Sequence, residues 1–581
     1  MPVRTNSPYR RLMRYTAHVM AVALGLSLSV QANAQTAGQL AESSYAPPAQ
    51  ALRGSLVFSG APGLKAPPGS DRLSIQLSGL SISGGLAGTE AAQARLRERL
   101  LNKRIAVSEI FAAAGEYEAA LASSGYVLAR VVIPAQTLVD GGALKITVVD
   151  GFIEAIDAAA VPEQLRRRLG QMTGRLVDRQ GLTLAELERS LLLAGDTYGV
   201  ALGSALSTGQ RSGGTVIILN PQFRRVTGFV GFDNTLSKDL GRLNVSSGVE
   251  FNGFLGMGDV FYLRASGHPD IGNYFSDLPT IRTLAAGGVV PIGASGLTAS
   301  LEVADSRTHN DAGPVATSST FTRYTMRLTY PWIRSTKRNV TFGVALDAQE
   351  DTQNLITTAG PFELYSDRTR VLRFSVDSQF QLASGGNLVL GASYSRGLDA
   401  FGARGLDDLA PGSFLSRQGA DAEFNKLEVN AAFSKALAEN WGMLVQGRAQ
   451  TSFGKAMLSN EQFGIASTDA LSPMSQGAVS GDSGWIVRAE VSRSFGTSVG
   501  GMPLVTSPYV FGAVGEVFLA NPTPGEFRRL GASAYGLGVE LALIRDPRFS
   551  SASLRAEYGQ ASVDEGGTSS ERLTLVGSFR F

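Results

Sequence analysis

Gly481-Asp482-Ser483-Gly484 is a sequence in which a serine could stand as a nucleophile. A nucleophilic serine needs a histidine base that is itself oriented by an acid. Of the three histidines, His18 lies in an N-terminal apolar stretch, and only His268 and His309 remain in the body of the chain. Both stand in polar, Gly- or Asn-containing surroundings typical of loops. We therefore reject a serine hydrolase and expect no catalytic residue.

The sequence does not support a metal site or a cofactor site either. The chain contains no cysteine, which excludes zinc and iron–sulfur sites built on thiolates and also excludes disulfides. We find no phosphate-binding GxxxxGK[ST] loop and no dinucleotide-binding glycine fingerprint. The N-terminal lead-in has no room for a lipase and no G-x-S-x-G turn. We expect no metal, no cofactor and no enzyme activity.

The clearest predicted strand lies at the C-terminus. From Glu571 to Phe581, apolar and polar side chains alternate, which predicts a strand with two different faces. The apolar set is Leu573, Leu575, Phe579 and Phe581, and the polar set is Arg572, Thr574, Ser578 and Arg580. Ending a chain on such a strand, with an aromatic last residue, is typical of bacterial outer-membrane barrels, whose lipid-facing residues alternate with lumen-facing ones.

The same alternation recurs throughout the chain beyond Arg224. Examples are residues 323–330, 372–380 and 426–434, where arginine, lysine, glutamine and serine occupy the polar positions. Arginine on so many polar faces favours a wet lumen over the packed centre of a soluble sandwich, which is the alternative fold. We count about 16 such strands, and an even number is expected of a closed bacterial barrel.

Composition and the N-terminus agree with export to a membrane. No stretch after residue 34 approaches the length of an apolar helix that crosses a bilayer, whereas glycine is abundant at 68 residues and charged residues make up only 18%. Residues 1–34 carry four arginines, a short apolar run and Ala32-Asn33-Ala34, the pattern of a cleaved signal peptide. The alternative, a membrane anchor, needs a longer apolar run. The expected mature chain, starting near Gln35, is close to neutral, so we expect no nucleic-acid partner.

Two small α/β units precede the predicted barrel. The expected divisions are a signal peptide at 1–34, a linker or plug segment at 35–71 with a short helix near Ala49–Arg53, two mixed α/β units at 72–150 and 151–223, and the barrel at 224–581. The first unit is predicted as a strand at 73–77, helices at 89–104 and 107–124, and strands at 127–134 and 144–149. The second repeats that order, with a strand at 152–156, helices at 164–172 and 182–194, and strands at 201–206 and 214–219.

The first unit carries the residues of a family resemblance. Gly125-Tyr126-Val127, Arg130 to Gln136, Asp140-Gly141 and Val148 to Gly151 resemble the first POTRA domain of two-partner secretion outer-membrane transporters, the TpsB type of the haemolysin secretion/activation family. The second unit resembles the family's second POTRA domain. The resemblance implies that the first domain binds a client, and the candidate residues are Tyr126, Arg130, Val132, Pro134 and Gln136.

Residues 461–490 resemble the family's long sixth barrel loop and the strand after it. Glu461, Gln462 and Phe463 match near its start, and Gly481, Asp482, Ser483 and Gly484 match at its end. The loop tip departs from the family, because Leu471-Ser472-Pro473-Met474 places Ser472 where the family has an arginine. In the barrel-wall segment that contains Phe511, Ala513 and Gly515, Ala513 stands where the family has the aspartate that pairs with that arginine.

Losing both members of this pair is physically coherent, because losing one would leave an unpaired charge in the barrel, at a cost of several kcal/mol if it is buried. We favour a subgroup with a relaxed loop anchor. The alternative is a shifted register in the comparison.

The resemblance implies an outer-membrane transporter of a Gram-negative bacterium, with its POTRA domains in the periplasm. Those domains would capture an unfolded exoprotein, an adhesin or a cytolysin, by adding its chain to a sheet edge. The client would then thread the barrel once the sixth loop, about residues 454–484, moves aside. Outer-membrane lipid or lipopolysaccharide and the barrel assembly machinery are the other implied partners. A related factor that assembles outer-membrane proteins is the alternative function, and a diffusion porin is a third. The family often has an N-terminal helix that plugs the pore, but residues 35–71 make a poor helix.

Overall fold

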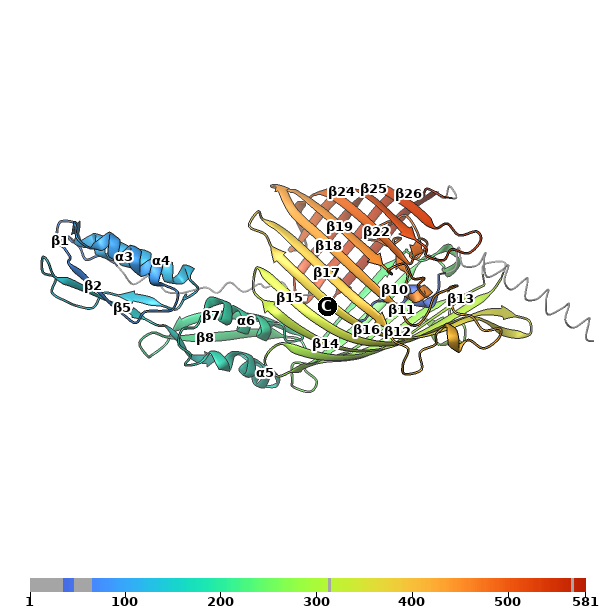
Figure 1. Cartoon of the computed structure of the whole chain (residues 1–581), viewed down its shortest axis with the longest axis horizontal. Coiled ribbons are helices and arrows are strands. Elements are labelled where there is room, and N and C mark those ends of the chain that lie inside the picture. The colour runs from blue at the N-terminus through green and yellow to red at the C-terminus, as the bar shows by residue number, and fades with distance from the viewer. Residues whose placement is uncertain (1–34, 46–64, 312–314, 566–568) are drawn as a thin grey trace, which may run out of the picture.

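A computed structural model of the chain describes residues 35–45, 65–311, 315–565 and 569–581. It consists of two small α/β domains followed by a closed β-barrel (Figure 1). The predicted signal peptide and the helix predicted near Ala49–Arg53 lie outside the described residues. Within the described residues, no helix is long and apolar enough to cross a membrane.

The first domain packs two helices against a three-stranded sheet of order β2-β5-β4, with β1 and β3 forming a separate pair. Leucine, isoleucine and valine on the inner faces of the helices and strands make a common core. The elements are β1 (Ser74–Gln76), β2 (Gly79–Ser83), α3 (Glu90–Leu100), β3 (Arg104–Ala106), α4 (Val107–Ser123), β4 (Arg130–Val132) and β5 (Ala143–Val149).

The prediction missed the strands β2 and β3, and two predicted boundaries in this domain were wrong. The first helix ends at Leu100 rather than Arg104, because Asn102 adopts a left-handed backbone conformation with φ 61° and the chain then enters β3. The predicted strand at 127–134 is only β4. Beyond it, the Gln136 side chain takes over the pairing with β5, accepting from the Lys145 N–H at 2.8 Å and donating to its C=O at 2.8 Å.

The second domain repeats the arrangement, with a sheet of order β6-β8-β7. Its elements are β6 (Phe152–Asp157), α5 (Glu163–Thr173), η1 (Gly174–Leu176), α6 (Leu184–Gly195), β7 (Val200–Thr208) and β8 (Gly214–Phe223). The domain is fixed to one end of the barrel by arginine side chains of both the barrel and the domain. Arg334 forms an ion pair with Asp196 at 2.7 Å, and Arg189 donates to the Pro331 carbonyl at 2.8 Å.

The barrel has 16 antiparallel strands, as predicted, counting β22 and β23 as one strand because both pair with β24. It closes where β27 pairs with β9. The strands are β9 (Val226–Asp233), β10 (Asn244–Asn252), β11 (Val260–Gly267), β12 (Ile281–Ile292), β13 (Leu297–Asn310), β14 (Thr317–Arg334), β15 (Arg338–Thr357), β16 (Gly360–Gln381), β17 (Gly386–Gly397), β18 (Asn425–Ala438), β19 (Trp441–Thr451), β22 (Ser483–Arg493), β23 (Phe495–Val499), β24 (Met502–Phe518), β25 (Arg529–Asp546), β26 (Ser550–Val563) and β27 (Ser569–Arg580).

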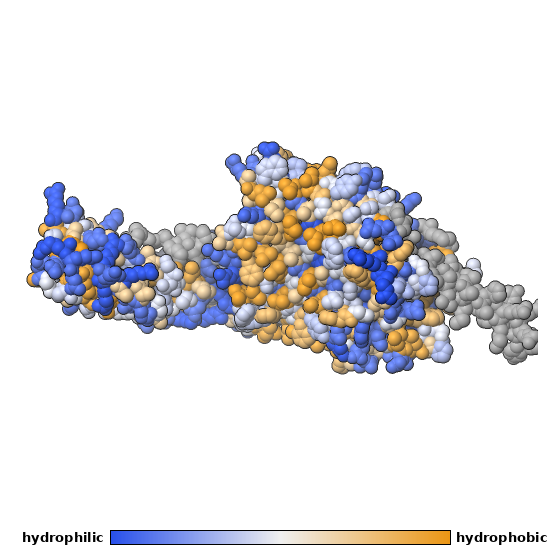
Figure 2. Space-filling view, turned by 45° about the horizontal axis from the view of Figure 1, so that its top comes forward, coloured by the Kyte–Doolittle hydropathy of each residue, from blue (hydrophilic) through white to orange (hydrophobic). Residues whose placement is uncertain are grey.

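The two faces of the barrel wall differ as the alternation predicts. Along β14, Tyr324 and Met326 are 58% and 54% exposed, whereas Arg323 and Thr325, which alternate with them, are buried. Apolar side chains gather over the barrel strands in Figure 2, which fits a lipid-facing surface. The arginines on the polar face point into the lumen. His309, expected in a loop, lies near the end of β13.

Candidate functional site

The lumen of the barrel is occupied by three segments of the chain itself. The first is residues 35–45, whose short helix α2 (Ala37–Leu40) contacts β13, β14 and η5 (Ser459–Glu461). The others are the buried parts of the connections 398–424 and 452–482, the fifth and sixth loops at the barrel end opposite the small domains. These segments meet the inward-facing side chains, so the conduit is obstructed from within.

The N-terminal segment runs along the inside of the wall. At one end, the Gln35 side chain accepts from the Ser237 N–H at 2.8 Å, close to the outer loops. At the other end, the Tyr45 N–H donates to Glu302 at 3.0 Å, and its ring packs against Tyr262 with 4.6 Å between centroids. Between them, Arg323 donates to the Glu42 carbonyl at 2.8 Å. A four-residue helix and an extended chain therefore lie where the family resemblance suggested a helical plug.

The tip of the sixth loop is held by a fully buried arginine of the wall, Arg488 on β22. Its guanidinium donates to Ser472 Oγ at 3.0 Å and to the Ala470 carbonyl at 3.1 Å, and it forms an ion pair with Glu557 at 2.5 Å. Ser472 also donates to Glu557 directly. The guanidinium stacks on the Phe511 ring, 3.8 Å from its centroid.

Neighbouring charges complete this cluster. Glu490 accepts from Arg488 at 2.7 Å, and Arg555 pairs with Glu490 at 2.6 Å and with Glu557 at 3.1 Å. The Tyr509 hydroxyl donates to Glu557 at 2.7 Å. Two arginines and two glutamates thus balance in charge, which a buried polar cluster requires.

Backbone contacts hold the same tip against β27. Thr574 donates to the Ser472 carbonyl at 2.9 Å, and Ser570 donates to the Pro473 carbonyl at 2.8 Å. Arg572 donates to the Met474 carbonyl at 3.3 Å. Leu471 and Met474 are buried among apolar wall residues that include Phe511 and Ala513. The residues predicted for the loop tip and the wall segment therefore lie together.

The anchor differs from the one that the sequence suggested. Ser472 does reach the wall, and Ala513 lies directly opposite Arg488 in the β22–β24 register. The arginine is on the wall and the neutral partner is on the loop, so the tip is anchored rather than relaxed. Sequence reasoning missed Arg488, Glu490 and Glu557. The sequence did contain one indication of them. Arg488 and Glu490 are alternate residues on the lumen-facing side of the first strand after the loop.

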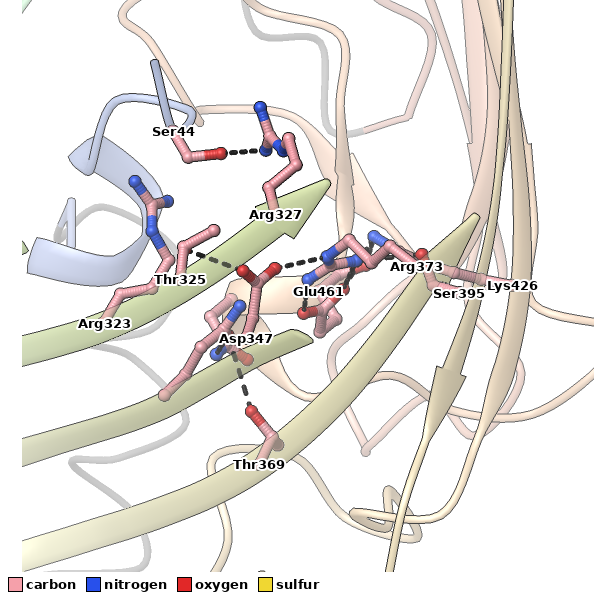
Figure 3. Close-up of polar contacts among 12 residues, drawn as sticks. Ser44, Arg323, Thr325, Arg327, Asp347, Thr369, Arg373, Ser395, Lys426 and Glu461 are labelled. Atoms are coloured by element: carbon pink, nitrogen blue, oxygen red, sulfur yellow. Dashed lines mark hydrogen bonds and ion pairs between the residues drawn. The ribbon is translucent and has the colours of Figure 1, made fainter. Parts of the chain in front are cut away.

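The start of the sixth loop has its own ionic anchor at Glu461, which is 1% exposed. Its carboxylate pairs with Arg373 of β16 at 2.5 Å and with Lys426 of β18 at 2.8 Å. Figure 3 shows Arg373 between Glu461 and Asp347, with which it pairs at 2.6 Å. The neighbouring Gln462 donates to Asp482 at 3.2 Å. Arg373 and Lys426 thus meet Glu461 and Asp347 inside the lumen, and Lys426 also pairs with Glu428 at 3.3 Å.

The Gly-Asp-Ser-Gly motif has a structural role, because its hydrogen bonds join the two ends of the loop. Asp482 accepts from the Met457 N–H at 2.9 Å and from the Ala520 N–H at 2.8 Å. Ser483 Oγ accepts from the Ser452 N–H at 3.0 Å and makes no histidine contact among the described residues. Phe463 pairs with Gly481 through the short strands β20 (Phe463–Gly464) and β21 (Ser480–Gly481).

One glycine of this motif and one of the neighbouring strand β24 are required by close approach of the two backbones. A Cβ on Gly484 would lie 2.6 Å from the Glu516 carbonyl oxygen, and one on Gly515 would lie 2.6 Å from the Trp485 carbonyl oxygen. We expect Gly484→Val to destabilise the barrel by about 1–3 kcal/mol through overpacking. Gly512→Val is the matched control, because nothing lies within 4 Å of its Cβ position. The measurement is the temperature at which each variant loses the fast migration of folded barrel in unheated gels, and equal temperatures would contradict the packing argument.

The client-binding candidates of the first domain divide into two groups. Tyr126, Arg130 and Gln136 are used internally: the Tyr126 hydroxyl donates to the Ala87 carbonyl at 3.0 Å, and Arg130 donates to the Ala129 carbonyl at 2.9 Å. The Pro134 carbonyl accepts from Gln136 at 3.2 Å. Val132 differs, since it lies on the edge strand β4 with its side chain 43% exposed.

The turn that precedes β5 is fixed by Asp140. Its carboxylate accepts from the Gln76 N–H at 2.8 Å and pairs with Arg104 at 2.6 Å. The backbone hydrogen bond from Gln76 lowers the pKa of Asp140, with Arg104 acting in the same direction. In the described parts of the chain, no group of three or more His, Cys, Asp or Glu side chains is arranged around a common metal position.

Comparison with known proteins identifies this architecture. The family model described as haemolysin secretion/activation protein ShlB/FhaC/HecB matches residues 213–541, and the ShlB-type POTRA domain matches residues 75–151. The outer membrane transporter CdiB of Escherichia coli O6:K15:H31 is 25% identical over 421 residues, 72% of this chain and 69% of that protein. The heme/hemopexin transporter protein HuxB of Haemophilus influenzae is 25% identical over 172 residues, 29% of this chain and 30% of that protein.

Solved structures agree on the fold. CdiB from Escherichia coli superposes with a TM-score of 0.67 at 18% identity, covering 100% of both chains. CdiB from Acinetobacter baumannii gives a TM-score of 0.60 at 16% identity, again over 100% of both chains. These relatives are transporters, and their barrels lie in the outer membrane with the POTRA domains in the periplasm. The chain belongs to the ShlB/FhaC/HecB family of haemolysin secretion/activation proteins, outer-membrane transporters with periplasmic POTRA domains.

Proposed function

We propose that this chain exports one large exoprotein, an adhesin or a cytolysin, which it captures unfolded in the periplasm and passes through its own barrel. The observation that carries the proposal is a barrel whose lumen is obstructed by residues 35–45 and the sixth loop. Membership of a family of exoprotein transporters and a lumen closed by the chain's own segments both support protein export. A barrel that only admitted small solutes would need no POTRA domains.

The obstruction is built from contacts that can exchange with water. The sixth loop is held at Glu461 and Ser472 by ion pairs and hydrogen bonds, and the N-terminal segment is held by hydrogen bonds and ring contacts. The chain has no cysteine, so no disulfide closes the lumen. An entering polypeptide carries its own backbone donors and acceptors and can replace these contacts one at a time.

Capture in the periplasm needs a free strand edge. β4 is an edge of the first POTRA sheet, and strand addition there would pair an extended client segment with its backbone. The Val131 N–H already donates to Glu118 at 2.8 Å, so a client would have to displace that side chain. The exposed Val132 side chain would then contact the client's alternate residues. We propose Val132 and its strand as the first contact.

The test is the content of the medium and the periplasm of the host with and without this chain. We expect one high-molecular-mass protein to disappear from the medium and to accumulate in the periplasm when the chain is absent. An adjacent gene that encodes a large repetitive exoprotein would identify the client. A fall in several outer-membrane barrels, with secretion unchanged, would instead indicate an assembly factor and would overturn the export proposal.

Val132→Asp tests the capture site. A charge at this position would have to be desolvated when a client strand covers it, at a cost of about 1–3 kcal/mol, so we expect secretion to fall roughly tenfold or more. Val139→Asp is the control, because Val139 is 62% exposed in the same domain and lies outside the sheet. Quantitative immunoblots of medium and membrane measure both variants. Equal secretion by the two, with equal barrel levels, would remove β4 from the proposal.

A further inference from the structure

Two aspartates on the lumen face of the wall have no charge partner. Asp351 of β15 and Asp367 of β16 are direct cross-strand neighbours, 0% and 1% exposed. Among the described residues, neither forms an ion pair, and Asp351 Oδ1, Asp351 Oδ2 and Asp367 Oδ2 have no hydrogen-bond partner. The fourth oxygen, Asp367 Oδ1, accepts from the Ser416 N–H at 2.9 Å. This site is separate from the balanced clusters around Arg488 and Glu461.

Two buried carboxylates in this position need a compensating charge. The Cβ atoms of directly opposed residues in an antiparallel pair lie about 4.5–5.5 Å apart, so the two negative charges repel each other strongly. The Arg404 guanidinium lies on the Asp367 side, but it donates to the Ser366 carbonyl at 2.7 Å and forms no ion pair with either aspartate. The charge must come from a proton or a bound cation.

In the described part of the chain, uncharged polar groups near the pair also lack hydrogen-bond partners. The Tyr365 hydroxyl, on a residue 5% exposed and near both aspartates and Thr36, and Asn460 Oδ1 have no partner in hydrogen-bond geometry among the described residues. The Ser319 hydroxyl lies near Asp351 without reaching hydrogen-bond geometry. A methyl group added at Gly38 would lie 2.7 Å from Asp351 Oδ2 and 3.3 Å from Asn460 Cβ, so these two residues flank one point.

We propose that Asp351 and Asp367 form a binding site for a hard divalent cation, with Ca²⁺ as the best-matched ion. A proton shared between the carboxylates would satisfy two oxygens and leave Tyr365 and Asn460 unpartnered. A calcium ion takes six to eight oxygen ligands in flexible geometry, so it could bind the two carboxylates together with the Asn460 amide oxygen and water. Two carboxylates also supply the charge that balances the ion.

The position of the site gives the cation a role in closure. Gly38 of the N-terminal segment lies against Asp351, and Asn460 belongs to the sixth loop. Ser416 of the fifth loop donates to Asp367 and accepts from the Ser459 N–H of the sixth loop at 2.9 Å. One ion would therefore connect all three lumen segments to the wall, in the half of the barrel near the short β15–β16 connection on the outer side.

The test is calorimetric titration of the purified, EDTA-washed full chain in detergent with CaCl₂ or MgCl₂ alone. We expect one saturable site, with affinity reduced by about tenfold or more in Asp351→Asn and in Asp367→Asn. Asp377→Asn, on the same face of β16 but ten residues away, is the matched control and should bind as the wild type does. The heat-dependent gel migration of the barrel verifies that each variant is folded.

Two results would overturn the site. One is a wild-type chain that binds neither Ca²⁺ nor Mg²⁺, which would assign the compensating charge to a proton. The other is undiminished binding by both aspartate variants, which would place any bound cation elsewhere, for example on residual lipopolysaccharide.

Discussion

Arg488→Met releases the tip of the sixth loop from the barrel wall. Arg488 is fully buried, and its guanidinium contacts the loop at Ser472 and at the Ala470 carbonyl while pairing with Glu490 and Glu557. Removing one partner of a buried ion pair costs about 3–5 kcal/mol, because the remaining charges stay buried without it. If this cost falls on the closed state of the loop, the open population rises by about 100-fold or more.

A single cysteine reports this opening, since the chain has none of its own. Val479 is suitable because it lies in the loop and is 4% exposed. We expect a water-soluble maleimide to label Val479→Cys at least about 100 times faster in the Arg488→Met background. Arg493→Met is the control, because Arg493 is on the same strand and stacks on Trp441 and Phe495 instead of contacting the loop. Unchanged labelling would show that the backbone contacts to β27 are sufficient to hold the loop tip in the closed position.

Glu461→Gln opens the other end of the same loop. The carboxylate of Glu461 is the common partner of Arg373 and Lys426, and the neutral amide leaves Arg373 with Asp347 and Lys426 with the 41%-exposed Glu428 as their remaining partners. We expect a destabilisation of about 3–5 kcal/mol and a larger ionic conductance in planar bilayers. Glu423→Gln is the control, because its pair with Arg396 is about half exposed and exposed pairs contribute little.

A second substitution separates charge from shape in that experiment. Lys426→Met in the Glu461→Gln background removes the buried cation that has lost its buried partner, so conductance should return most of the way to the wild-type value. Conductance that stays high in the double variant would mean that the geometry of Glu461, rather than its charge, holds the loop.

The barrel and both POTRA domains could be predicted from the sequence because each rests on a local pattern. Alternation of period two along segments such as 323–330 marks one lipid-facing and one lumen-facing side, and the strand–helix–helix–strand–strand order marks the small domains. Boundaries were less accurate where side chains substitute for backbone pairing. Gln136 completes the pairing of β5, and no propensity of residues 127–134 indicates that β4 would stop at Val132.

The anchors of the sixth loop could be predicted only in part. Glu461, Asp482 and the surrounding glycines were found because they match a family pattern over consecutive residues. Arg488 and Glu557 are 69 positions apart in the sequence, and their meeting depends on the register across β22, β24, β25 and β26. The same holds for Asp351 and Asp367, whose cross-strand register only the folded sheet defines. Contacts between distant strands of a closed barrel are not indicated by the local alternation of apolar and polar residues.

The central claim is that the exoprotein passes through this lumen after the internal segments leave it. A reversible cross-link tests it most directly. The Ala37 N–H donates to Ser319 Oγ at 3.3 Å, so cysteines at these two positions would join the N-terminal segment to β14. We predict that Ala37→Cys/Ser319→Cys blocks secretion when oxidised and regains it on reduction, while each single variant secretes normally. Full secretion with the disulfide completely formed would contradict the account.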